Sequence, residues 1–258
     1  MRILLHADDF GASAETVSAT IECFQHSALT SASVMAGMPA TADALAFAKA
    51  NPELDVGVHL TFVGGGDERP VSDPADIPSL VDEDGRFLST RAIRLRATAR
   101  RLPLEQIEHE IVAQISAVRD EGVEISHVDS HRHVHKLPQF REALAKTLPR
   151  FEIERVRAVQ DVYLRKPYRS ATYWLGGRWQ RWLSRAFTTT EHMYMPTSAG
   201  DIGWENALAE IARSLDGTLE VGVHPGYGDW RDGERTSVLA FAEVVRRDGH
   251  ELVSWRDL

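Results

Sequence analysis

The sequence predicts an α/β fold, a (β/α) barrel of the TIM-barrel type with seven or eight parallel strands. Short β-type runs alternate with segments of helical periodicity along the chain, and 258 residues is a common length for one such barrel. The eight candidate strands are residues 2–6, 32–35, 55–60, 125–129, 155–159, 192–195, 219–223 and 252–255. We therefore expect one domain over residues 1–258.

Two of the helices between these runs have clear boundary signals. In residues 104–118 the aliphatic side chains fall on one stripe, and Pro103 precedes them as a start signal. In residues 236–249 two cations, Arg246 and Arg247, are followed by Gly249, which is the usual end of a helix. Both segments fit crossover helices between parallel strands.

Two segments are additions to a minimal barrel. Residues 63–87 form a long connection rich in Gly, Pro and Asp, and connections of this length are usually functional or disordered. Residues 161–190 hold six Arg or Lys against one acid, together with three tryptophans. One predicted helical stripe there is Leu175, Trp179, Trp182, Leu183 and Ala186. We favour burial in the core or a homodimer contact for this stripe, with peripheral contact to a membrane surface as the alternative.

Composition excludes several classes of function. The formal net charge of -9 argues against nucleic-acid binding, which requires a surplus of Lys and Arg. The single cysteine, Cys23, cannot form an intrachain disulfide and indicates a reducing, cytoplasmic compartment. Three apolar residues follow Arg2, too few for a signal peptide, and no run reaches the roughly 18 apolar residues of a transmembrane helix.

Polar clusters follow four of the predicted strands. They are "ADDFG" after the first, His59 at the end of the third, "DSHRHVH" after the fourth and "VHPGYGD" after the seventh. The carboxyl ends of parallel strands meet on one face of a barrel, where active sites are built. We therefore expect these Asp and His side chains to converge.

The segment "DSHRHVH" alternates histidine with other residues. In extended backbone Asp129, His131, His133 and His135 would share one side, with Arg132 on the other. Such a series offers one ligand to a metal, and His133 and His135 as donors or acceptors to a substrate. The alternative is that these imidazoles cap loops or line a hydrogen-bonded rim.

The remaining clusters have competing interpretations. Asp8 and Asp9 could divide cation binding and proton transfer between them, or Asp9 could cap the following helix. His59 could be a metal ligand or a satisfied core histidine, and His224 has the same strand-end position. One Asp and two His around an open position suit a divalent metal that activates water. The motifs of P-loop proteins, serine hydrolases and dinucleotide-binding folds are missing from the sequence.

Taken together, these motifs resemble the YdjC-like carbohydrate deacetylases. "HADDFG", "GVHLTF", "HVDSHRHVHKLP", "VGVHPGY" and "SWRDL" occur in the order of that family and span nearly the whole chain. The resemblance implies a barrel-type fold and the hydrolysis of an N-acetyl group from an acetamido sugar, assisted by a divalent metal usually taken as magnesium.

The resemblance also implies roles for single residues. Asp9, His59 and His131 match the metal ligands, Asp8 matches the general base, and His224 matches the acid that protonates the leaving amine. Arg157 matches a residue that orients the base or the substrate. In this sequence Arg132 replaces a histidine of the family's usual run, and His6 stands where Asn or Thr is common.

Alternatives remain open at this point. Two imidazoles and one carboxylate suit Zn²⁺, Mn²⁺ or Co²⁺ better than the Mg²⁺ that the resemblance implies. A metal phosphoesterase is a rival enzyme, and it would hold two ions about 3.5 to 4 Å apart rather than one. A sugar-binding protein without turnover is the rival outside the enzymes.

Overall fold

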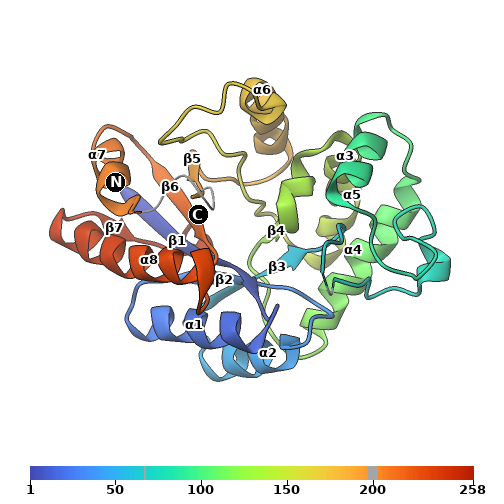
Figure 1. The fold of residues 1–258 in the computed structure, drawn as a ribbon, viewed down its shortest axis with the longest axis horizontal. Coiled ribbons are helices and arrows are strands. Elements are labelled where there is room, and N and C mark those ends of the chain that lie inside the picture. The colour runs from blue at the N-terminus through green and yellow to red at the C-terminus, as the bar shows by residue number, and fades with distance from the viewer. Residues whose placement is uncertain (67, 197–202) are drawn as a thin grey trace.

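A parallel sheet of seven strands forms the centre of the molecule (Figure 1). The computed structural model describes residues 1–66, 68–196 and 203–258. The strand order is β4-β3-β2-β1-β6-β5, and β7 pairs with β1. The strands are β1 Arg2–Phe10, β2 Ser31–Val34, β3 Asp55–Leu60, β4 Val128–Ser130, β5 His192–Tyr194, β6 Thr218–Val223 and β7 Glu251–Leu252. The predicted parallel α/β barrel is therefore confirmed, in the form of a half-barrel.

Strand β1 lies in the middle of the sheet and is buried on both faces. It pairs with β6 over residues 2–7, while β7 and β2 share its other edge. Ile3 and Leu5 pack into the main hydrophobic cluster, whereas Leu4 packs against Trp255 in a separate small cluster. Because side chains alternate along a strand, the side that carries Leu4 also carries His6 and leads toward Asp8.

Helices surround the sheet. They are α1 Ala14–Gln25, α2 Thr41–Ala50, α3 Thr90–Thr98, α4 Leu104–Arg119, α5 Pro138–Thr147, α6 Ala171–Ala186, α7 Glu205–Ala212 and α8 Asp229–Arg247. In Figure 1, α1, α2 and α8 lie together near β1, α3, α4 and α5 gather at the opposite end, and α6 stands at the rim. Both helices with predicted boundaries are found: α4 begins directly after Pro103, and Gly249 follows α8 with a positive φ of 71°. Among the described residues, no helix has the length and apolar character needed to cross a bilayer.

The predicted strand 155–159 is not a regular strand. Its residues form only isolated bridges, Val128 to Val156 on one side and Arg155 to Thr188 on the other. Strand β4 is only three residues long, so it offers too few backbone groups for a regular strand to pair with it at Val156. The segment still links β4 to the chain that leads into β5, and thereby joins the two edges of the half-barrel.

The end of the chain also differs from the prediction. The predicted strand 252–255 ends at Leu252, and the short 3-10 helix Trp255–Asp257 follows it. Ser254 caps this helix, with its side chain accepting from the backbone N–H of Arg256 at 3.2 Å. Trp255 is fully buried, so the turn supplies core packing that the predicted strand would have supplied.

The described part of the connection 63–87 is anchored to the barrel. Glu110 on α4 accepts hydrogen bonds from the backbone N–H groups of Val71 and Ser72, at 2.9 and 3.0 Å. Ile77 and Leu80 are fully buried in the main hydrophobic cluster. These contacts place the connection beside α4.

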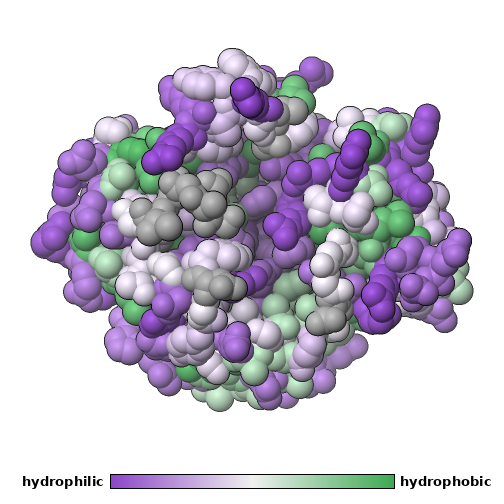
Figure 2. Space-filling view, in the orientation of Figure 1, coloured by the Kyte–Doolittle hydropathy of each residue, from purple (hydrophilic) through white to green (hydrophobic). Residues whose placement is uncertain are grey.

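Helix α6 is rotated relative to the predicted stripe. Leu183 is fully buried as expected, and Trp179 and Trp182 are half-buried. Leu175 and Ala186, however, are exposed, because the helix turns Gly176 toward the barrel, where it packs beside Val159. In Figure 2 the α6 end of the molecule is mostly pale, with separate strongly hydrophilic side chains among residues of intermediate hydropathy.

Candidate active site

Strand β1 delivers two consecutive carboxylates to the same end of the sheet. Its pairing with β2 is irregular after Ala7. Ala7 pairs with Ala32 and Phe10 pairs with Val34, so β1 has one residue more than β2 in this interval. Asp9 takes up the extra residue with a positive φ of 58°, a conformation that Asp tolerates better than most residues. Adjacent side chains on a regular strand would diverge, so this bulge explains how Asp8 and Asp9 both line one cavity.

The structure brings Asp9, His59 and His131 together. Asp9 Oδ1 lies 3.1 Å from His131 Nδ1 and 3.4 Å from His59 Nε2, and one donor atom from each residue lies within 4.8 Å of the others. The second oxygen of Asp9 accepts a hydrogen bond from Arg231 at 2.6 Å. Burial would raise the pKa of Asp9, but the hydrogen bond and charge of His131 hold it well below its usual value. Asp9 is therefore an anion directed at two imidazoles.

His131 reaches this position in a way that the predicted alternation does not describe. Strand β4 ends at Ser130, and residues 131–136 form the 3-10 helix η2, in which Arg132 and His133 both have left-handed backbone. The extended series through His135 is therefore wrong. The turn places His131 and His133 in the wall of one cavity of about 470 Å³, together with Asp8, Asp9, His59 and His224.

His135 does not line this cavity. It is buried, and its Nδ1 lies 2.7 Å from the hydroxyl oxygen of Ser130. Burial lowers the pKa of His135 to about 3, so the ring is neutral near pH 7. The predicted substrate contact for His135 is not found among the cavity residues, whereas the predicted contact for His133 keeps an accessible position.

Asp129 orients His59. Its Oδ1 lies 2.8 Å from His59 Nδ1, which leaves Nε2 directed at Asp9. Burial would lower the pKa of His59, but the charge and hydrogen bond of Asp129 outweigh it and raise the pKa to about 9. A carboxylate behind an imidazole is the usual arrangement that fixes a metal-binding histidine. Sequence reasoning placed Asp129 beside the histidines but gave it no role.

Arg157 binds the carboxylate of Asp8. The fully buried guanidinium donates to both oxygens of Asp8 at 2.7 Å and to Glu220 at 2.6 Å, and it lies 2.7 Å from Asp129. Burial would raise the pKa of Asp8, but the positive charge of Arg157 lowers it. Of the two predicted roles for Arg157, contact with the base is found. Contact with a substrate is not, because Arg157 does not line the cavity.

His224 lies close to Asp8 in the wall of the same cavity. Its Nε2 lies 3.8 Å from Asp8 Oδ2, and its Nδ1 lies 3.1 Å from Glu234 on α8. Burial would lower the pKa of His224, but the hydrogen bond and charge of Glu234 raise it. The cavity therefore presents an ionised carboxylate and, 3.8 Å from it, an imidazole whose raised pKa makes it hold a proton more tightly than an ordinary histidine does.

Comparisons with known proteins show the family of this chain. The model of the YdjC-like protein family matches residues 2–251. The chain belongs to the YdjC-like family. A carbohydrate deacetylase from Geobacillus stearothermophilus is 33% identical over 228 residues, which cover 88% of this chain and 80% of the relative. The resemblance noted in the sequence is thereby confirmed.

Solved structures support the same fold. A candidate cellobiose-phosphate cleavage protein from Enterococcus faecalis superposes with a TM-score of 0.82 at 21% identity, covering 99% of this chain and 98% of the other. A family 4 carbohydrate esterase from Streptomyces lividans, solved with acetate, gives a TM-score of 0.51 at 14% identity, covering 98% and 91%. At these identities the similarity concerns the fold.

Other residues of this YdjC-like site were missed by sequence reasoning. Glu234 and Arg231 lie on α8, ten and seven residues after His224, where no spacing pattern distinguishes them from surface charges. Glu68 comes from the connection 63–87 and lies 3.9 Å from His131 Nε2. A long polar connection was the one available signal for Glu68.

The donor set of Asp9, His59 and His131 fits a divalent cation. One carboxylate and two imidazoles from separate strands and turns leave further coordination positions on the cavity side, as catalytic sites do. A second group, His6, Asp8 and Asp129, also has donor atoms within 4.8 Å of one another. Arg157 already neutralises both carboxylates of that group, so it offers a cation little gain.

Proposed function

We propose that this YdjC-like protein is a metal-dependent hydrolase that removes the N-acetyl group from an acetamido sugar. The observation that carries the proposal is the convergence of Asp9, His59 and His131 in the same cavity as a carboxylate, Asp8, and an imidazole, His224. The deacetylase relative from Geobacillus stearothermophilus supports the reaction class, because it matches most of this chain.

The proposed metal site consists of Asp9, His59 and His131. A divalent ion bound there would supply Lewis-acid chemistry, polarising the acetyl carbonyl and making water more acidic. The family resemblance favours Mg²⁺, whereas two imidazole nitrogens in the donor set favour Zn²⁺, Mn²⁺ or Co²⁺. Because ligating histidines must be neutral, His59 would have to release its proton to solvent when a metal binds, since the positive charge of Arg157 holds the pKa of Asp129 well below its usual value.

Asp8 and His224 would divide the proton transfers. Asp8 accepts a proton from the attacking water while the water oxygen bonds to the acetyl carbon. His224 donates its proton to the amide nitrogen as the carbon–nitrogen bond breaks, so acetate and a free amine leave. Arg157 lowers the pKa of Asp8 and fixes its carboxylate, and Glu234 raises the pKa of His224 and so favours its protonated form. His133 is placed to contact the sugar, because it lies in the same cavity wall.

The direct test is release of acetate. Metal-loaded protein incubated with N-acetylglucosamine oligomers is expected to release acetate and free amine in equal amounts, and chelator-treated protein is expected to release neither. The assay is repeated with several N-acetyl sugars and with Mg²⁺, Zn²⁺, Mn²⁺ and Co²⁺. Calorimetric binding of a sugar without any acetate would instead identify a binding protein.

Replacement of Glu234 should shift the pH dependence. Glu234 raises the pKa of His224, and His224 is proposed to act in its protonated form. In Glu234→Gln the pKa falls, so the decline of kcat/KM at alkaline pH should begin at lower pH than in the parent protein. The measurement is a pH profile of acetate release.

The control for this variant is Glu243→Gln on the same helix. Glu243 is exposed, and in the described part of the chain its one ion pair is with Arg246, at 2.5 Å. Its pH profile should match that of the parent protein. An unchanged alkaline limb in Glu234→Gln would show that His224 is not the proton donor or that Glu234 does not act on it.

A further inference from the structure

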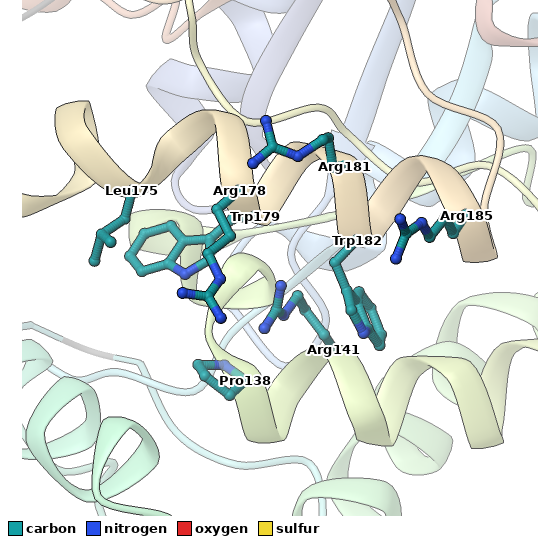
Figure 3. A pocket seen from close by; sticks show the side chains of 8 residues that line it. All are labelled: Pro138, Arg141, Leu175, Arg178, Trp179, Arg181, Trp182 and Arg185. Carbon is teal, nitrogen blue, oxygen red and sulfur yellow. The ribbon is translucent and has the colours of Figure 1, made fainter.

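A second cavity, distinct from the candidate active site, lies between α5 and α6 (Figure 3). Its volume is about 530 Å³. Its walls carry four arginines and two tryptophans, which are Arg141, Arg178, Arg181, Arg185, Trp179 and Trp182. No residue lines both this Arg–Trp cavity and the cavity around Asp8.

The arginines of the Arg–Trp cavity have no anionic partners within residues 1–66, 68–196 and 203–258. Among the residues that the structure describes, no carboxylate lines the cavity, and none of the four arginines makes a salt bridge. Many other arginines in this chain are paired, as Arg213 is with Asp248 at 2.7 Å. Four unpaired guanidinium groups around one hollow create a strongly positive potential in an otherwise acidic protein.

Of the four arginines, Arg141 most clearly lacks a hydrogen-bond acceptor. Its guanidinium lies 4.5 Å from the centre of the Trp182 ring, and its Nε is buried without a hydrogen-bond partner. Burial and the charge of Arg178 lower the pKa of Arg141. Arg141 is not a solvated side chain on an open helix surface, because it lies between α5 and α6 (Figure 3). Because the Nε is inaccessible, a bound anion would be held by the end of the guanidinium, which Figure 3 shows directed toward α6.

We propose that the Arg–Trp cavity binds a phosphate-bearing ligand. Guanidinium groups match phosphate oxygens in pairs, and a phosphate or diphosphate offers enough charge and acceptors for several arginines, which one carboxylate does not. The rings of Trp179 and Trp182 line the same hollow and offer apolar faces to whatever carries the phosphate. The carrier can be a soluble phosphate ester or the headgroup of an anionic lipid, since both present the same group.

The position of the cavity connects it to the active site. Pro138, which lines it, follows η2 after a single residue, and η2 carries His131 and His133. Helix α6 also contacts η2. A ligand in the Arg–Trp cavity therefore sits behind the turn that positions one predicted metal ligand.

Isothermal titration with pyrophosphate and with glucose 6-phosphate, at constant ionic strength, tests the proposal. We expect saturable binding by the parent protein and at least about tenfold weaker binding by Arg178→Gln/Arg181→Gln. A hydrogen bond to a charged group contributes about 1.5 to 3 kcal/mol, and a tenfold change in affinity corresponds to about 1.4 kcal/mol. The matched control is Arg91→Gln/Arg150→Gln, which removes two exposed arginines elsewhere and should bind like the parent. Absence of saturable binding to phosphates and to vesicles alike, or equal affinity in the cavity variant, would overturn the proposal.

Vesicles distinguish the two sources of phosphate. Cosedimentation with phosphatidylglycerol vesicles but not with phosphatidylcholine vesicles, lost in the cavity variant, would assign a lipid headgroup. Binding of soluble phosphates alone would assign a soluble ester. A dimer that dissociates in the cavity variant, with no phosphate or vesicle binding by the parent, would show that a second copy covers the cavity and would refute a phosphate site.

Discussion

Asp8→Asn should lower kcat for acetate release by about 10² to 10⁴-fold, the usual contribution of a general base. The substitution keeps the shape of the side chain but removes the charge that accepts the proton of water. Arg157 donates to both oxygens of Asp8, and an amide can accept only one of these bonds. The variant is therefore expected to be less stable as well as less active, and its melting temperature and metal content are measured beside its activity.

Asp55→Asn is the matched control for this variant. Asp55 is also a buried aspartate on a parallel strand, but it lies at the opposite end of its strand from His59 and accepts a hydrogen bond from the backbone of Arg256 at 2.8 Å. Its activity should stay close to that of the parent protein. A folded, metal-loaded Asp8→Asn protein that deacetylates at the parent rate would remove Asp8 from the mechanism.

His131→Ala should abolish stoichiometric metal binding and lower activity by at least about 10³-fold, equivalent to about 4 kcal/mol of transition-state stabilisation. His131 is the most accessible of the three proposed ligands, 14% exposed, so its removal disturbs the core less than removal of His59. Metal per chain is measured by elemental analysis after dialysis, and acetate release is measured on the same sample.

His192→Ala provides the comparison. His192 is also partly exposed and pairs with a carboxylate, Asp161, at 2.8 Å, but it lies outside the cavity. It should retain one ion per chain and full activity. Full metal occupancy in His131→Ala would place the ion elsewhere. Two ions per chain in the parent protein, with phosphate ester hydrolysis, would support the rival phosphoesterase function.

The overall fold and the meeting place of the site residues could be predicted because both follow from strand order. Parallel strands end at one edge, so Asp9 after the first strand, His59 on the third and His131 after the fourth had to approach one another. Segment 155–159 was misassigned because its alternation of arginine with valine and alanine suits a strand, whereas regular pairing depends on the length of β4, which a run of residues does not specify.

The finer geometry of the site could not be predicted from the sequence. Positive φ values at Asp9, Arg132 and His133 are imposed by the surrounding structure, since no glycine marks these positions. The same holds for Glu234, which reaches His224 only because α8 packs beside the sheet. Local patterns identified six of the residues that line the cavity but missed Arg231 and Glu234, and tertiary packing determines which atoms face each other.

The ion pairs of Arg157 affect how the protein unfolds. Its neutralising carboxylates arrive on three different strands, with Asp8 on β1, Asp129 on β4 and Glu220 on β6. An intermediate with any one of these strands detached would leave an ion without its counter-charge in an apolar interior. Partly unfolded forms are therefore penalised, and we expect denaturation to proceed as a single cooperative transition in which catalytic competence and global structure disappear together.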